Sequence, residues 1–350
     1  GFYQDIDNDN IPEFLAAPNH VENGEDIECA WLYKNVGSAD NIIWEHQQND
    51  FLVGEMLDLG SNAAPAFLDY NADGLTDLVV GTGGDWQWTS KGGLALFENI
   101  GNLTEPNFKL IDTDWLNFSE LTDTLSNFTP AFGDMDNDGD LDLVVGTKIG
   151  SLIYSENTGG AGNPVQFPEK ITKWNNFTPG KNAAPQIMDM NRDGLADIIV
   201  GVRTGDLRYY QNIGIPGNSQ FDPNHNMTPN ISALGEIDGA GQGFVGNATP
   251  FLIDRNTHFT LLLATADPGL RHYEFKKNEL DSEISPVDSD LGQIRLGDYL
   301  YPAAEDLDGD GFLEIVVGNR RGGLTIFGSD LGVTSTDEID LDEEVSIFPN

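Results

Sequence analysis

The residues best suited to chemistry lie in a nine-residue pattern that recurs along the chain. Asp or Asn stands at positions one, three and five, glycine usually follows at position six, and an acid stands at position nine. Oxygen donors at alternating positions can converge on one point, and glycine permits the positive φ that turns the chain sharply. Several carboxylates held in one turn require a hard cation, and an all-oxygen cage of this kind favours calcium. The five copies are Asp5–Glu13, Asp69–Asp77, Asp134–Asp142, Asp189–Asp197 and Asp306–Glu314.

In each copy we expect the side chains at positions one, three, five and nine, with the backbone carbonyl at position seven, to bind the ion. One such loop is often only a solvated turn, whereas five copies favour metal binding, so we predict about five calcium sites. A sixth segment, Asp254–Leu262, lacks the acids at positions five and nine, and we expect it to hold no metal. The predicted ligands are Asp5, Asp7, Asp9, Ile11 and Glu13; Asp69, Asn71, Asp73, Leu75 and Asp77; Asp134, Asp136, Asp138, Asp140 and Asp142; Asp189, Asn191, Asp193, Leu195 and Asp197; and Asp306, Asp308, Asp310, Phe312 and Glu314.

The chain is strongly acidic throughout. Its 350 residues include 58 acids against 17 bases, a formal net charge of −41, and the two positive charges of each of five calcium ions would still leave −31. Nucleic acid and anionic membrane surfaces are poor partners for such a charge. The single cysteine, Cys29, excludes an intrachain disulfide. The chain has no continuous apolar run long enough for a transmembrane helix, so no membrane span is expected.

The loops mark a repeat of about 58 residues, because the five copies and the sixth segment begin at residues 5, 69, 134, 189, 254 and 306. A proline-containing entry such as NAAPAFLD precedes the loop, a run such as LVVG follows it, and a glycine turn leads to a third segment such as GGLALFENIG. Four strands per unit without helical periodicity predict an all-β fold, a β-propeller of four-stranded blades. Six repeats are visible, both six and seven blades stay open, and a β-sandwich is the alternative.

These units resemble the FG-GAP or VCBS repeats of integrin-like β-propellers. Strings such as YYQNIG and AAEDLDGDGFLEIVVG are more closely similar to secreted FG-GAP-repeat proteins of Bacteroidetes. The resemblance covers roughly residues 1–328 and implies the propeller fold and a calcium role for the matching loop residues. It implies no single function, because such propellers serve as adhesins, lectins, lyases and scaffolds.

The amino-acid composition changes near the end of the sequence. Residues 329–344 are acidic, polar and poor in aromatic side chains, which predicts a flexible linker. The string VSIFPN at 345–350 resembles the start of the C-terminal sorting domain of type IX secretion substrates; the alternative is an arbitrary apolar hexapeptide. The resemblance implies a bacterial protein that contacts the type IX secretion machinery during export and ends outside the cell or attached to the outer-membrane surface.

Signatures of catalysis are scarce. The histidines show no H-E-x-x-H spacing, and the chain has no G-x-S-x-G elbow and no phosphate-cradling loop. We therefore expect no enzymatic activity, although residues distant in sequence converge at the centre of a propeller. A polysaccharide lyase or glycosidase is the least favoured reading.

Binding is the expected function. Trp86 and Trp88 lie in a glycine-flanked insertion, residues 83–93, where they could stack on sugar rings, anchor a protein partner or cover an exposed blade edge. The first hypothesis is a secreted or cell-surface, non-catalytic adhesion or protein-interaction module, one form of which is a subunit of an outer-membrane surface complex. The alternative is a carbohydrate-binding, lectin-like propeller. The partner is accordingly a protein or a glycan at the cell surface.

Overall fold

The computed structural model is almost entirely β and divides into two compact units, Gly1–Asp58 and Leu59–Asn350. The structure describes residues 2–6, 9, 11–17, 30–38, 41–49, 51, 59–84, 91–121, 125–226, 228–240, 245–267, 269–333 and 347–349.

The first unit is one antiparallel sheet with its strands in sequence order. An aromatic cluster covers part of it: the ring of Phe14 lies 5.1 Å from that of Tyr3 and 5.6 Å from that of Trp44. The strands are β1 (Phe2–Gln4), β2 (Glu13–Ala16), β3 (Trp31–Asn35) and β4 (Trp44–Gln48).

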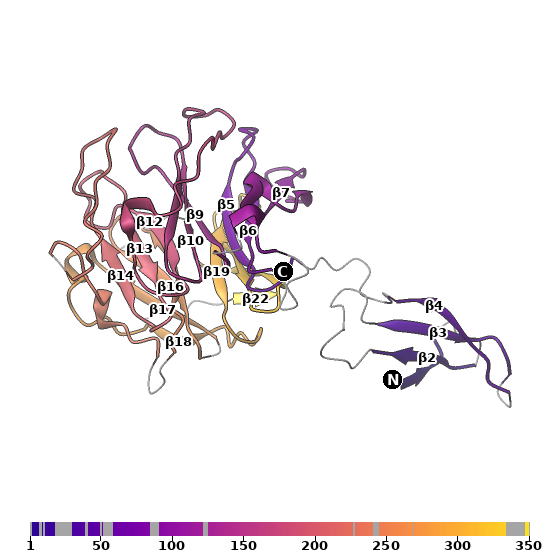
Figure 1. Ribbon diagram of the computed structural model, residues 1–350. Helices are drawn as coiled ribbons and strands as arrows, with labels where there is room; N and C mark the ends of the chain where they lie inside the picture. The colour runs from indigo at the N-terminus through magenta and orange to yellow at the C-terminus, as the bar shows by residue number, and fades with distance from the viewer. Residues whose placement is uncertain are drawn as a thin grey trace. The chain divides into compact units, whose positions relative to one another are not determined.

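The second unit contains five antiparallel sheets, each a meander in sequence order (Figure 1). Three have four strands, and two have three, where the isolated bridges Tyr154–Ile171 and Tyr209–Ile231 stand in place of a fourth strand. The strands are β5 (Ala64–Leu68), β6 (Asp77–Gly81), β7 (Leu94–Asn99), β8 (Phe108–Asp112); β9 (Thr129–Gly133), β10 (Asp142–Gly146), β11 (Leu152–Ser155); β12 (Ala184–Met188), β13 (Asp197–Gly201), β14 (Leu207–Tyr210); β15 (Thr249–Asp254), β16 (Phe259–Ala264), β17 (Leu270–Phe275), β18 (Asp288–Leu291); and β19 (Tyr301–Glu305), β20 (Glu314–Gly318), β21 (Leu324–Ser329), β22 (Ile347–Pro349). Four short 3₁₀ turns lie between strands: η1 (Trp115–Leu121), η2 (Trp174–Asn176), η3 (Leu234–Glu236) and η4 (Lys277–Glu279).

These sheets form a propeller, which confirms the predicted fold class. The first strands contact one another in the order β5, β9, β12, β15 and β19, and β19 returns to β5. Within the described residues of this unit, five sheets therefore close a ring, and the first of the six visible repeats forms the sheet of the first unit. Gly318, at the end of β20, packs directly against Ala63 just before β5, and this contact closes the ring.

The glycine that ends the VVG-type strands permits the close approach of neighbouring blades. A Cβ on Gly146 would lie 2.1 Å from the carbonyl oxygen of Ala183, which precedes the next blade. Beside this contact, the N–H of Ala183 donates to the carbonyl of Thr147 at 3.1 Å. The same pairing recurs for Gly81 with Phe128, Gly201 with Ala248 and Gly318 with Ala63. The repeated VVG and proline-containing strings are therefore the two sides of one interface between blades.

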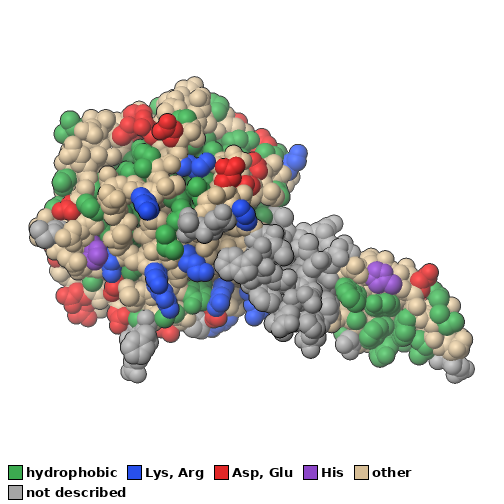
Figure 2. All heavy atoms as spheres, viewed as in Figure 1, with side chains coloured by type: hydrophobic (Ala, Val, Ile, Leu, Met, Phe, Trp, Pro, Cys, Tyr) green, Lys and Arg blue, Asp and Glu red, His purple; other side chains and the backbone are tan. Residues whose placement is uncertain are grey.

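The hydrophobic core lies between successive sheets. Ile199 and Tyr209 of one blade pack in one cluster with Leu261 and Tyr273 of the next. The viewed face of the second unit shows basic and acidic side chains with hydrophobic ones between them (Figure 2). Among the described residues, none of the helices is both long and apolar enough to span a membrane.

The C-terminal residues include one described strand. Ile347–Pro349, which the sequence assigns to the start of a sorting domain, form β22 and pair antiparallel with β21. Most of the predicted linker, residues 334–344, lies outside the described residues. The domain boundaries at 328 and 344 and the secretion role of this end therefore stay predictions.

Candidate functional site

The predicted loops join the first and second strands of their sheets, and their own backbone hydrogen bonds shape them. In Asp134–Asp142, the two carboxylate oxygens of Asp134 accept from the N–H groups of Asp138 and Gly139, both at 3.0 Å. The carboxylate of Asp138 accepts from the N–H of Asp140 at 3.0 Å. Gly139 has a φ of 94°, the left-handed conformation that glycine adopts without strain. The sequence therefore folds a tight turn with its carboxylates on the inner side.

The acid at position nine is buried at the start of the second strand. Asp142 is 1% exposed, and it accepts hydrogen bonds from the N–H groups of Met135 and Asn157 at 3.1 and 2.8 Å. Burial raises the pKa of the Asp142 carboxyl to about 7 despite these bonds. Burial likewise raises the pKa of Asp197 to about 7 and that of Asp77 to about 6. A nearby cation would favour the charged form of all three carboxyls.

Two loops bring three acids together at a spacing that could hold a metal ion. Oxygens of Asp134, Asp136 and Asp138 lie within 4.8 Å of one another, as do oxygens of Asp306, Asp308 and Glu314. Oδ1 of Asp136 is buried and has no hydrogen-bond partner among the described residues. An unpaired buried carboxylate oxygen is costly, and a set of carboxylate oxygens is the donor set of a hard cation. The residues present therefore fit a calcium ion.

Two further loops carry an amide at position three. In Asp69–Asp77, Nδ2 of Asn71 donates to Asp73 at 2.9 Å and to Glu98, on β7, at 3.3 Å. Nδ2 of Asn191 donates in the same way to Asp193 at 2.9 Å in Asp189–Asp197. In these two loops an amide replaces the acid at position three, and it donates a hydrogen bond to the carboxylate at position five. The turns otherwise repeat the bonds of the acidic loops, since Asp69 and Asp189 both accept from the N–H groups of positions five and six.

The first loop belongs to the first unit. Glu13 accepts from the N–H of Ile6 at 2.8 Å, which matches the bond made by the acid at position nine in the other loops. Asp7 lies outside the described residues, as do Trp86 and Trp88. In all five loops, the backbone N–H of the residue at position seven donates a hydrogen bond to the carboxylate at position five. The residues at position seven are Ile11, Leu75, Asp140, Leu195 and Phe312. The role of their carbonyls as ligands stays a prediction.

Sequence reasoning missed a partner at or just after the end of the third strand. The backbone N–H groups of Asn99, Asn157 and Asn212 donate to the buried acid at position nine, at 2.7, 2.8 and 2.8 Å. The side-chain oxygen of each of these asparagines accepts from the N–H of the glycine two residues later, which fixes the turn. The signal was present in the sequence as the recurring strings ENIG, ENTG and QNIG.

The sixth segment folds into a shorter loop than its sequence suggests. Strand pairing sets Ile253 opposite Thr260, as it sets Met188 opposite Asp197 in the preceding blade. Thr260, and not Leu262, therefore occupies position nine, because this loop is two residues shorter. Thr260 is fully buried, as Asp197 is.

A guanidinium group from the neighbouring blade lies against this shorter loop. Arg192, at position four of Asp189–Asp197, makes a bidentate ion pair with Asp254, in which Nη2 lies 2.6 Å from Oδ1. The guanidinium also lies over the ring of Phe259, 4.6 Å from its centre. A side-chain cation thus neutralises the carboxylate at position one, where the other loops are expected to use a metal.

The same sheet holds a second cluster of paired polar side chains. Glu274 on β17 lies 2.9 Å from Nε2 of His258 and 2.7 Å from Nε2 of His272. Thr260 donates to Glu274 at 2.7 Å, and Arg255 donates to Thr260 at 3.2 Å. Burial lowers the pKa of His258, against the raising effect of Glu274. Among the described residues, Oε1 of this carboxylate accepts hydrogen bonds from side chains, whereas Oε2 has only the ion-pair contact with His258.

Replacing Arg192 by Met is expected to lower the free energy of unfolding by about 1 kcal/mol, because it removes a paired charge and a cation–π contact. Urea unfolding in saturating calcium measures the change. Arg203→Met is the matched control, since the Arg203 side chain is exposed and forms no hydrogen bond or ion pair with the described residues. Equal losses in both variants would contradict the assigned role of Arg192.

Two of the loops lie in a stretch of the chain that matches a known repeat family. Residues 69–145 match the family described as FG-GAP-like repeat. No curated protein matches the chain. Among solved structures, the chain is similar to a lectin from Agrocybe aegerita, described as recognising non-reducing terminal N-acetylglucosamine, with 15% identity, a TM-score of 0.36 and coverage of 92% of this chain and 74% of that one. That sugar specificity is a property of the lectin, and a match at this level carries no argument about this chain.

Proposed function

We propose that this chain is a calcium-stabilised β-propeller that serves as a non-catalytic adhesion or protein-interaction module, secreted or at the cell surface. The supporting observation is the convergence of Asp134, Asp136 and Asp138 in one turn, with a buried carboxylate oxygen on Asp136 that lacks a partner among the described residues. Related loops recur between the first and second strands of other blades. Calcium at these positions would fix the first hairpin of a blade and hold the surrounding loops rigid for binding.

Calcium binding tests the first part of this proposal. Titration of the chelator-treated protein with CaCl₂ in a calorimeter is expected to count about five sites. Asp138→Ala is expected to lose one of them, because it removes the acid at position five of one loop. Asp298→Asn, at an exposed acid outside the loops, is expected to lose none. Absence of any calcium heat would reject the proposal.

Interaction with a partner tests the second part. Tethered protein is expected to retain a surface protein in calcium and to release it after chelation, and to yield no product from pectic or other acidic polysaccharides. Release of sugar products would favour a lyase or glycosidase instead.

A carbohydrate-binding propeller is the second candidate, and the insertion that carries Trp86 and Trp88 favours it. The ends of this insertion are held by a bridge between Gly84 and Lys91, so the segment begins and ends at one place on its blade. Glycan-array binding that disappears in Trp86→Ala and Trp88→Ala would select this alternative. An array without hits, together with a calcium-dependent protein partner, would select the interaction module.

Export by the type IX route is proposed from the VSIFPN string alone. The test is cell fractionation of a bacterial host with and without a functional type IX system. The protein is expected in the medium or on the outer membrane only when that system works.

A further inference from the structure

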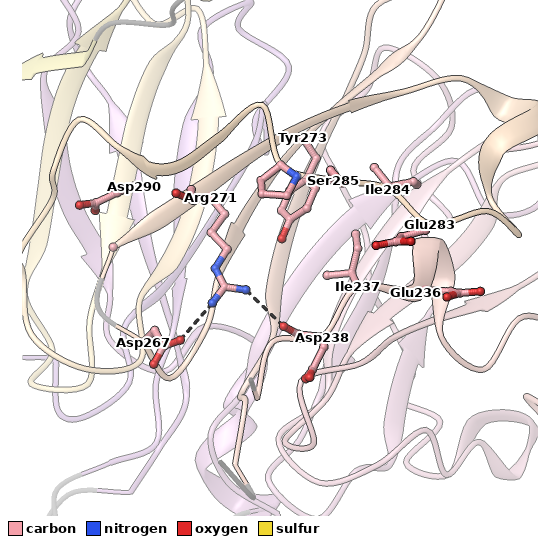
Figure 3. A pocket seen from close by; sticks show the side chains of 13 residues that line it. Glu236, Ile237, Asp238, Asp267, Arg271, Tyr273, Glu283, Ile284, Ser285 and Asp290 are labelled. Atoms are coloured by element: carbon pink, nitrogen blue, oxygen red, sulfur yellow. Dashed lines mark hydrogen bonds and ion pairs between the residues drawn. The ribbon is translucent and has the colours of Figure 1, made fainter. Parts of the chain in front are cut away.

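A separate cavity lies between two neighbouring blades of the second unit. It has a volume of about 480 Å³, within the range typical of small-ligand pockets. The turn at η3, strand β17 and the segment that leads into β18 surround it (Figure 3). None of the predicted calcium-loop residues lines it.

A buried tyrosine points its hydroxyl into this cavity. Tyr273 is 3% exposed, and Figure 3 shows its phenol oxygen pointing inward, between Arg271 and Ile237. This hydroxyl makes no hydrogen bond with the residues that the structure describes. The hydroxyl is therefore available to form a hydrogen bond with a group that enters the cavity.

Some of the charged side chains that line the cavity are already paired with other residues. The guanidinium of Arg271 is committed to the carboxylate of Asp267 at 3.0 Å and to the carbonyl of Asp238 at 3.3 Å. The carboxylate of Asp290 accepts from Arg295 at 2.6 and 2.7 Å.

Two acids on the other side of the cavity have no such partner. Glu236 and Glu283 are exposed, and their carboxylates form no ion pair with the described residues. Beside them, Ile237 and Ile284 supply apolar surface and are 4% and 9% exposed. The cavity therefore combines apolar walls, a free hydroxyl and an excess of negative charge.

We infer that this cavity receives the basic side chain, lysine or arginine, of a protein partner. The methylene groups of such a side chain would pack on Ile237 and Ile284, while its charged end would meet Glu236 and Glu283. The hydroxyl of Tyr273 accepts a further hydrogen bond from the same cation. The inference rests on the proposed role as a protein-interaction module and names the chemistry of the partner. The net charge of −41 would also speed the approach of a basic partner.

The probe is a capped Gly-Arg-Gly or Gly-Lys-Gly peptide, added to the calcium-loaded chain with labelled isoleucine methyl groups. The methyl NMR signals of Ile237 and Ile284 are expected to shift, whereas those of Ile153 and Ile315, in other blades, stay in place. A capped Gly-Gln-Gly peptide is expected to cause no shift. Binding is expected to weaken when the salt concentration rises, because the contact is between opposite charges.

Two conservative variants test the assigned residues. Glu283→Gln is expected to weaken peptide binding about tenfold, and Tyr273→Phe about threefold, since each removes one polar contact to the cation. Asp281→Asn, an exposed acid two residues away that does not line the cavity, is expected to leave the affinity within twofold. Unchanged unfolding midpoints exclude misfolding as the cause.

Several outcomes would overturn the inference. They are an absence of shifts with both basic peptides, equal weakening in Asp281→Asn, or binding of glucosamine at this cavity without binding of the peptides. A partner that is still captured equally well by Glu283→Gln would reject this cavity and leave the proposed function intact. Loss of calcium binding with peptide binding retained would reject the calcium proposal and leave the cavity intact.

Discussion

Chelation of calcium is expected to lower the thermal unfolding midpoint of this protein substantially. With a dissociation constant of ~0.1 mM and ~1 mM calcium, both ordinary for extracellular modules, each site contributes about 1.4 kcal/mol to the free energy of unfolding. Five independent sites would contribute about 7 kcal/mol, comparable with the whole stability of an ordinary domain. The direction follows from the charges, because without a cation Asp134, Asp136 and Asp138 repel one another in one turn.

The measurement is calorimetric or circular-dichroism unfolding in calcium, in EGTA, and after calcium is restored. Asp138→Ala is expected to lose part of the calcium-dependent increment, and Asp298→Asn is expected to keep all of it. Potassium chloride at equal ionic strength is the control for simple charge screening. A midpoint that stays the same after chelation would show that hydrogen bonds alone hold these turns.

The local parts of this structure were predictable from sequence. The spacing of Asp134, Asp136 and Asp138 places three side chains on the inside of one turn. The sequence also predicts that the chain turns sharply at Gly139, and Gly139 has a positive φ in the structure. The VVG-type runs form the second strands, because β-branched residues fit a pleated buried surface. These features depend on neighbours within about ten residues, so a single sequence can carry them.

The parts that sequence reasoning missed depend on contacts between distant residues. The closure of the ring rests on Gly318 against Ala63, far apart in the chain. Arg192 meets Asp254 across a blade boundary, and neither residue stands out in its own repeat. The two-residue shortening of the sixth loop shows only in strand pairing, since the acids that would mark its register are absent.

The cavity near Tyr273 also could not be foreseen. Its walls come from a turn, a strand and a segment of irregular backbone in two successive repeats. Those segments are the variable parts of the repeat. They contain no recurring string by which one repeat could be aligned with the next. Specific binding in a repeat fold is commonly carried by such variable segments, so the least predictable residues are also the ones that bear on function.

Replacing Gly146 by Ala is expected to lower the free energy of unfolding by about 3 kcal/mol, because overpacking at a rigid contact forces the backbone apart. The added Cβ would lie 2.1 Å from the carbonyl oxygen of Ala183 and 2.7 Å from Cδ of Pro185. Neither atom can move freely, since Pro185 belongs to β12 and the N–H of Ala183 is bonded to Thr147 at 3.1 Å. The cost is therefore steric and falls on the contact between two blades.

Gly162→Ala is the matched control for this variant. Gly162 has a φ of 73° and nothing within 4 Å of an added Cβ, so its substitution reports backbone strain alone, about 1 kcal/mol. Urea unfolding in calcium and in EGTA should show the same extra loss for Gly146→Ala in both media, because the blade contact does not involve the metal loops. If Gly146→Ala were no less stable than Gly162→Ala, the close approach of neighbouring blades could not be what the recurring glycine provides.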